Sequence, residues 1–155
     1  MNEIWFEICR SLPTVIRIAG WGQIVLILGS LGIPTVLDWR EKLSPLSVLI
    51  RQMFWVYSLY IWCTNLCFGL ISAFGAPLLL DGSPLAAYVT GFIFGYWMLR
   101  MIVQWLYFDI SELPQNAFNT AARWLLEVLF IGLILVYGAA LVYNIQLLRA
   151  VPHAY

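Results

Sequence analysis

Five polar side chains interrupt long apolar stretches of the chain: Arg51, Arg100, Gln104, Arg123 and Glu127. Arg100 and Gln104 are one helical turn apart, and so are Arg123 and Glu127. Charges in apolar surroundings are costly, so each residue is a candidate for holding a ligand or an ion. Paired charges can instead fix the register of neighbouring helices, and we favour that structural role for this polar network.

The composition around these residues is that of a membrane protein. The chain has 155 residues, of which 63% are hydrophobic and 10% are charged. A soluble domain usually has about 45–50% apolar and about 25% charged residues. The basic residues are scattered and the formal net charge is zero, which argues against binding nucleic acid. We therefore predict an integral membrane protein that lies in the lipid bilayer.

Four stretches are long and apolar enough to cross a bilayer as helices. They cover about residues 18–37, 53–74, 85–108 and 121–148. Their apolar runs are continuous rather than alternating, which indicates helices. Short connections make successive helices antiparallel neighbours. The predicted fold is all-α, with a single transmembrane domain over residues 1–155 that forms an antiparallel four-helix bundle.

The last two predicted helices bring Arg100 and Glu127 to one depth. Arg100 lies eight residues before Phe108, and Glu127 lies six residues after Ala121. At the rise of an α-helix, both lie about 9–12 Å inside the same face of the bundle. We therefore predict an ion pair between Arg100 and Glu127.

Hydroxyl and proline residues mark the expected helix ends. Ser44–Pro45 and Ser83–Pro84 each place a capping hydroxyl before a proline, a pattern that favours a helix start. Asn119 or Thr120 is expected to cap the last helix. Pro34 is expected to kink or end the first helix.

The first residues of the chain carry an amphipathic pattern. Apolar side chains of residues 4–12 share one helix face, with Glu3, Glu7 and Arg10 on the other. This pattern predicts a short helix over residues 2–12 that lies in the membrane interface. A frayed tail is the alternative.

The basic residues set the expected orientation. Four lie at the first and third loops or at the helix ends beside them: Arg40, Lys42, Arg51 and Arg123. Three lie on the opposite side: Arg10, Arg17 and Arg149. By the positive-inside rule, the first and third loops are cytoplasmic. We expect the bacterial inner (plasma) membrane as the location.

The second predicted helix carries a polar stripe. Arg51, Ser58, Asn65 and Ser72 recur every seven residues and share one narrow helix face. Such a face should point to the bundle interior, where neighbouring groups satisfy Asn65. Helix packing is the preferred interpretation, and the lining of a cavity is the alternative.

The third predicted helix carries a face of small residues. Ala87, Gly91 and Gly95 are spaced one turn apart, which allows a second backbone to approach closely. This face lies nearly opposite Arg100 and Gln104 on the same helix. Either this helix is central in the bundle, or one of its faces meets another subunit.

The residues that most catalytic and cofactor sites need are missing. Cys9, Cys63 and Cys67 form no CxxC pair, and His153 is the single histidine. The sequence has no nucleophile elbow and no Gly-rich phosphate loop. We expect no catalytic residue, no metal and no cofactor.

Two pairs of loop acids could bind a cation. Asp38 and Glu41 lie in the first loop, and Asp109 and Glu112 lie in the third. Solvated loop charges are the preferred interpretation of both pairs.

In size and helix count the chain is similar to two classes of membrane protein: eicosanoid and glutathione enzymes, and small multidrug transporters. The first class would need a Glu after Asn65, and the second would need a Glu within residues 18–37. Neither is present, so neither resemblance extends to functional residues.

We expect a non-catalytic accessory or structural membrane subunit that binds a partner helix or a hydrophobic ligand such as lipid. A homo-oligomer or a membrane protein partner is compatible with this expectation. The alternative is a small homo-oligomeric transporter or channel that uses the polar network.

Overall fold

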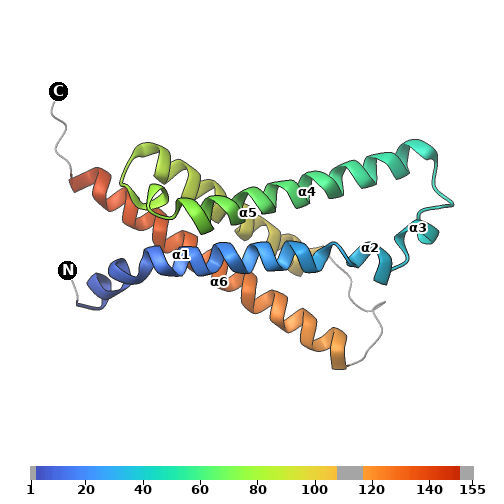
Figure 1. Cartoon of the computed structure of the whole chain (residues 1–155), viewed down its shortest axis with the longest axis horizontal. Helices are drawn as coiled ribbons and strands as arrows, with labels where there is room; N and C mark the ends of the chain where they lie inside the picture. Colours follow the sequence, from blue (N-terminus) through green and yellow to red (C-terminus); the bar gives the residue numbers. More distant parts are fainter. Residues whose placement is uncertain (1–2, 108–116, 151–155) are drawn as a thin grey trace. The chain divides into compact units, whose positions relative to one another are not determined.

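The computed structural model describes residues 3–107 and 117–150, in which helices are joined by short turns (Figure 1). The elements are α1 (Glu3–Ser30), α2 (Ile33–Val36), α3 (Trp39–Lys42), α4 (Val48–Gly75), the 3-10 helix η1 (Leu78–Leu80), α5 (Pro84–Leu106) and α6 (Ala117–Ala150). No strand occurs within these two ranges. The predicted all-α class is confirmed.

Within the described ranges, four helical segments are long and apolar enough to cross a membrane. They are Cys9–Val36, Val48–Gly75, Pro84–Leu106 and Arg123–Ala150. Each overlaps one of the four predicted spans, and each exceeds the length that a bilayer requires. The chain therefore has the helices of an integral membrane protein.

The chain divides into two compact units. The α1–α4 unit comprises Arg17–Ala76, and the α5–α6 unit comprises Pro77–Tyr155 with Met1–Ile16. The single domain over residues 1–155 remains a prediction, and so does the four-helix bundle.

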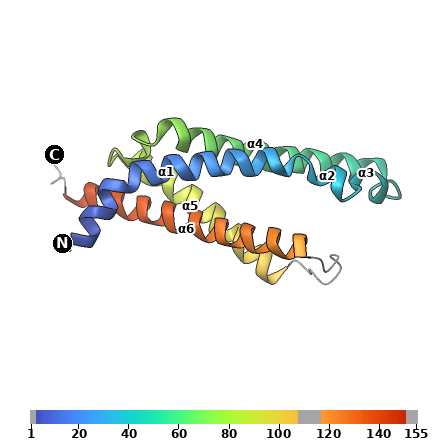
Figure 2. The same ribbon diagram turned by 60° about the horizontal axis from the view of Figure 1, so that its bottom comes forward.

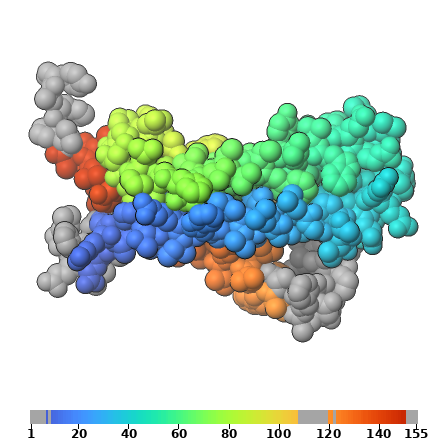
Figure 3. Space-filling view, in the orientation of Figure 1, coloured from blue at the N-terminus to red at the C-terminus, as the bar shows by residue number. Residues whose placement is uncertain are grey.

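Two glycines bring the helices of the α1–α4 unit into backbone contact. A Cβ atom added to Gly20 would meet the backbone of Ala73 and would lie 2.8 Å from the Gly69 carbonyl oxygen. A Cβ atom added to Gly69 would lie 2.9 Å from Cγ1 of Ile24. This order of contacts makes the two helices antiparallel, as Figure 2 shows. Their atoms lie directly against each other in the space-filling view (Figure 3).

Large side chains fill the contact between α5 and α6. The Phe94 ring lies 3.2 Å from the position that a Cβ atom of Gly138 would take. The rings of Trp97 and Phe130 lie 5.2 Å apart, centroid to centroid. Residue numbers rise on α5 as they fall on α6, so these helices are also antiparallel.

The first helix has other bounds than the predicted first span. α1 is one helix from Glu3 to Ser30, so the short helix predicted over residues 2–12 continues directly into the span. The helix ends four residues before Pro34, because the proline ring would clash with the carbonyl of Ser30 and proline has no N–H to donate. Pro34 lies at the start of α2 instead. An interfacial position for the first residues remains a prediction.

The capping signals are confirmed at one helix and wrong at another. The Ser83 hydroxyl oxygen accepts a hydrogen bond of 3.1 Å from the first turn of α5, as predicted. α4 begins at Val48 after Ser47, not at Ser44–Pro45. The reason is that residues 43–46 form a hydrogen-bonded turn that closes α3.

The start of the last helix also differs from the prediction. α6 begins at Ala117, so Asn119 and Thr120 lie inside its first turn rather than before it. Asp109, Glu112 and His153 lie outside the described residues.

Candidate functional site

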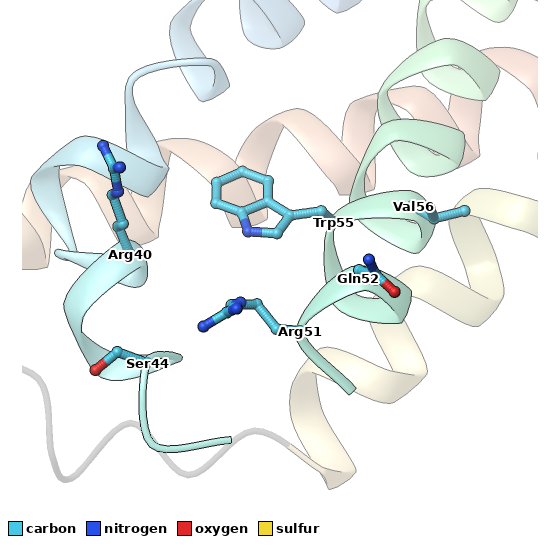
Figure 4. A pocket seen from close by; sticks show the side chains of 6 residues that line it. All are labelled: Arg40, Ser44, Arg51, Gln52, Trp55 and Val56. Carbon is cyan, nitrogen blue, oxygen red and sulfur yellow. The ribbon is translucent and has the colours of Figure 1, made fainter. Parts of the chain in front are cut away.

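An open cavity of about 750 Å³ lies where α3 approaches the first turns of α4 (Figure 4). It is lined by Arg40, Ser44, Arg51, Gln52, Trp55 and Val56. Arg51 and Trp55 are four residues apart on α4 and therefore share a helix face. Figure 4 shows both side chains reaching from α4 towards α3 and the turn that carries Ser44. We name this space the basic cavity.

Three aromatic rings hold α3 against α4 at this cavity. Trp39 packs edge to face on Phe54, with centroids 4.9 Å apart, and on Trp55 at 6.0 Å. Such pairs contribute about 0.5–1.5 kcal/mol each beyond the area they bury. Because Arg40 directly follows Trp39, these contacts keep Arg40 at the cavity wall.

Two guanidinium groups, those of Arg40 and Arg51, give the basic cavity its positive charge. Among the described residues, neither Arg40 nor Arg51 forms an ion pair or a side-chain hydrogen bond. Arg40 is exposed and Arg51 is half-buried. With the Ser44 hydroxyl and the Gln52 amide, the cavity offers several hydrogen-bond donors and two positive charges. That donor set suits a phosphate or a similar oxyanion.

A second open cavity of about 460 Å³ shares two wall residues, Arg40 and Trp55, with the first. Its other lining residues are Pro34, Thr35, Asp38 and Glu41. The two carboxylates form no ion pair and no side-chain hydrogen bond within the described part of the chain. Asp38 has a left-handed backbone, with φ of 51°. We name this space the acidic cavity.

A third polar centre, which was not predicted from the sequence, lies at the loop between α4 and α5. Asn144 of α6 is completely buried. Its Nδ2 donates to the Leu79 carbonyl oxygen at 2.8 Å and to the Thr90 hydroxyl at 3.4 Å, and its Oδ1 accepts from the Gly82 N–H at 3.1 Å. Thr90 donates in turn to the Ala86 carbonyl at 2.7 Å. We name this set of hydrogen bonds around Asn144 the Asn144 clamp. Its bonds all join protein groups, so its role is structural.

The structure places four of the five residues of the predicted polar network on α5 and α6. Arg100, Gln104, Arg123 and Glu127 are all half-buried. The Arg100 guanidinium lies 5.4 Å from the centroid of the Phe130 ring, so it reaches α6 at the α5–α6 contact. The ion pair between Arg100 and Glu127 remains a prediction.

Arg51, the fifth member of that network, belongs to the α1–α4 unit and lines the basic cavity. Arg51 was predicted as a polar residue within an apolar stretch, but Arg40 and Trp55 were not predicted as its neighbours. Arg40 had counted only towards orientation. Their meeting depends on the turn after α3, which spacing along the chain does not reveal.

The polar stripe of α4 is placed largely inside the protein. Asn65 and Ser72 are buried, and Ser58 is half-buried. Asn65 Nδ2 donates to the Ile61 carbonyl at 2.8 Å, and the Ser58 hydroxyl donates within its own helix at 2.8 Å. Ser72 lies at the close approach of Gly20. Arg51, the first residue of the same stripe, lines the basic cavity. Packing as the role of the stripe remains a prediction.

The small residues predicted to form one face of α5 differ in their surroundings. A Cβ atom on Gly91 would lie 3.4 Å from Leu141 of α6, whereas nothing lies within 4 Å of that position at Gly95. Ala87 is half-buried. The close backbone approach occurs instead between Gly20 and Gly69 in the α1–α4 unit. The Gly69-x-x-x-Ala73 spacing on the second span was the signal that could have predicted it.

Comparison with known proteins finds no matching family model, no matching curated protein and no matching solved structure. No group of three or more His, Cys, Asp or Glu side chains is placed to hold a metal ion in the part of the chain that the structure describes. The two cavities and the residues that line them are therefore the features from which a function is inferred.

Proposed function

We propose that this chain is a non-catalytic membrane protein that binds a phospholipid at its first loop. The observation that carries the proposal is the basic cavity, in which Arg40, Arg51 and Trp55 meet and neither arginine forms an ion pair with a described residue. Basic pockets beside spanning helices bind lipid headgroups through charge and hydrogen bonds. Tryptophan is enriched at the same depth, because its ring is apolar and its N–H is polar.

The position of the cavity supports a lipid over a soluble anion. Arg51 and Trp55 lie in the first turns of α4, at one end of a candidate spanning helix, where headgroups would be found. Val56 lines the cavity and is exposed, and Leu59 and Tyr60 continue an exposed surface along α4. A bound phosphate would therefore have an apolar surface beside it on which acyl chains can lie.

The wider setting of this site belongs to the same proposal. The two antiparallel helix pairs would associate as one four-helix bundle in the bacterial inner membrane, with the first and third loops cytoplasmic. The basic cavity would then face the cytoplasmic leaflet, where anionic lipids attract basic residues. Gly95 leaves an open position on α5 at which a second copy or a partner helix could approach.

Native mass spectrometry of protein purified in mild detergent tests lipid binding directly. The wild type is expected to retain phospholipid, and the double variant Arg40→Gln/Arg51→Gln is expected to lose it. The matched control is Lys42→Gln/Arg10→Gln, which removes the same charge from exposed residues outside both cavities. Equal retention by all three proteins would overturn the proposal.

One observation favours the alternative function, a small homo-oligomeric transporter or channel. Nε of Arg123 is buried and has no hydrogen-bond partner among the described residues, and Arg100 lies at the α5–α6 contact. Ionisable side chains within spanning helices are expected along an ion or solute path. Solute or proton flux in vesicles that is abolished by Glu127→Gln would establish this function.

A further inference from the structure

We propose that the ligand of the first loop carries a primary ammonium as well as a phosphate, as the headgroup of phosphatidylethanolamine does. The inference rests on the proposed function and adds the chemical class of the lipid. It is carried by the juxtaposition of two cavities of opposite charge that share Arg40 and Trp55 as walls.

The basic cavity accounts for the phosphate. Arg40 and Arg51 supply charge and paired N–H donors, and the Ser44 hydroxyl supplies another donor. Guanidinium groups bind phosphate oxygens in pairs, which fixes the orientation of the phosphate as well as its position.

The acidic cavity accounts for the ammonium. Asp38 and Glu41 line this cavity together with one cation, Arg40. Among the described residues neither carboxylate forms an ion pair, so the cavity keeps an excess of negative charge. A primary ammonium has three N–H donors for these oxygens, and the Trp55 ring can attract the same cation through its π-face. Because Arg40 and Trp55 belong to both cavities, a short linker between phosphate and ammonium is enough to occupy the two together.

Other ligand classes fit the pair of cavities less well. A lipid with an anionic headgroup and no ammonium would leave two carboxylates facing a negative ligand. A hard divalent cation usually takes six or more oxygen ligands, and this cavity supplies two carboxylates. A quaternary ammonium has no N–H to donate to Asp38 and Glu41.

The backbone at Asp38 agrees with a use for its carboxylate. Its φ of 51° lies in the left-handed region, where glycine is less strained than any residue with a Cβ. Asparagine, like aspartate, tolerates this conformation better than most residues with a Cβ. Asp38→Asn therefore removes the charge and leaves the turn intact.

Titration with short-chain lipids in detergent tests the inference. Dioctanoyl phosphatidylethanolamine, phosphatidylglycerol and phosphatidylcholine are added in turn to the full chain, and binding is followed by native mass spectrometry. The wild type should bind the ethanolamine lipid about fivefold more tightly than the other two. Asp38→Asn/Glu41→Gln should remove this preference, whereas the control Glu7→Gln/Asp81→Asn, with the same change in charge at exposed residues, should keep it.

The outcomes separate this inference from the proposed function. Equal binding of all three lipids, unchanged by Asp38→Asn/Glu41→Gln, would overturn the ammonium and leave phospholipid binding standing. No binding of any lipid would overturn both. Soluble glycerophosphoethanolamine that binds as tightly as the lipid would support the headgroup chemistry and overturn the lipid as its source. Inorganic phosphate that competes equally well would overturn the ammonium.

Discussion

The first loop, between α1 and α4, and the second loop, between α4 and α5, differ in whether protein groups bond to their polar side chains. In the second loop, Asn144 bonds to Leu79, Gly82 and Thr90, and the loop is closed by the protein itself. In the first loop, charged groups line two open cavities and have no protein partner among the described residues. Polar groups that the protein satisfies hold the fold together, whereas those it leaves open are available to a ligand.

Each loop also contains one residue with a left-handed backbone. The two residues differ in how well their type suits that conformation. Gly82 has φ of 73°, and glycine adopts that backbone without strain. Asp38 has φ of 51°, and its Cβ atom strains the backbone in a way that glycine would avoid. The second loop thus has the residue that stability favours, and the first has a residue whose carboxylate lines a cavity.

The largest effect is expected from Asn144→Leu. The change would leave the Gly82 N–H and the Leu79 carbonyl without their partner, and the free energy of unfolding should fall by about 2–4 kcal/mol. Thermal unfolding in detergent measures the loss. Arg149→Leu, at an exposed side chain on the same helix, is the control and should change stability by less than about 0.5 kcal/mol. Equal effects of the two variants would remove the distinction between a clamped loop and an open one.

A smaller loss is expected from Gly20→Ala, which tests how the α1–α4 unit is held without a polar clamp. The new Cβ would collide with the backbone of Ala73, and overpacking of this kind destabilises by about 1–3 kcal/mol. Gly29→Ala on the same helix meets nothing within 4 Å and should be neutral or slightly stabilising. Unfolding of both variants in detergent gives the comparison. A harmless Gly20→Ala would contradict the close helix contact.

The left-handed residues give an opposed pair of variants with intermediate effects. Gly82→Ala strains the backbone and brings a Cβ atom to 2.9 Å from Leu147 Cδ1, so stability should fall by about 1–2 kcal/mol. Asp38→Gly relieves strain and should be neutral or stabilising while it weakens binding of the ethanolamine lipid. If Asp38→Gly destabilised the fold as much as Gly82→Ala does, the carboxylate would be structural.

The smallest effect concerns the Asp81 carboxylate in the second loop. The hydroxyl and the N–H of Ser83 both donate to it, and these hydrogen bonds lower the pKa of Asp81 below its usual value. The stabilisation is therefore present at neutral pH and is lost as the pH falls through the lowered pKa. The melting temperature of the wild type should fall more steeply below about pH 4 than that of Asp81→Asn. Parallel curves for the two proteins would show that these bonds add nothing.

The sequence was sufficient for the fold class, because continuous apolar runs define spanning helices regardless of tertiary contacts. Ser83 was also predictable as a cap, since a cap depends on neighbours in the chain. The Asn144 clamp and the basic cavity were not predictable, because both depend on segments that only the tertiary structure brings together. The first helix ended at Ser30 rather than Leu37, since the clash of Pro34 acts four residues upstream.

Hydrogen exchange of the two loops, with and without phosphatidylethanolamine, tests the contrast between them most directly. The backbone amides of residues 39–44 should exchange about tenfold more slowly when the lipid is present, because a ligand bound across the two cavities opposes opening of the turn. The amides of residues 78–83 should be protected already and should not respond, because Asn144 holds them in either condition. Protection that rises in residues 78–83 and stays constant in residues 39–44 would contradict the assignment of the first loop as the ligand site.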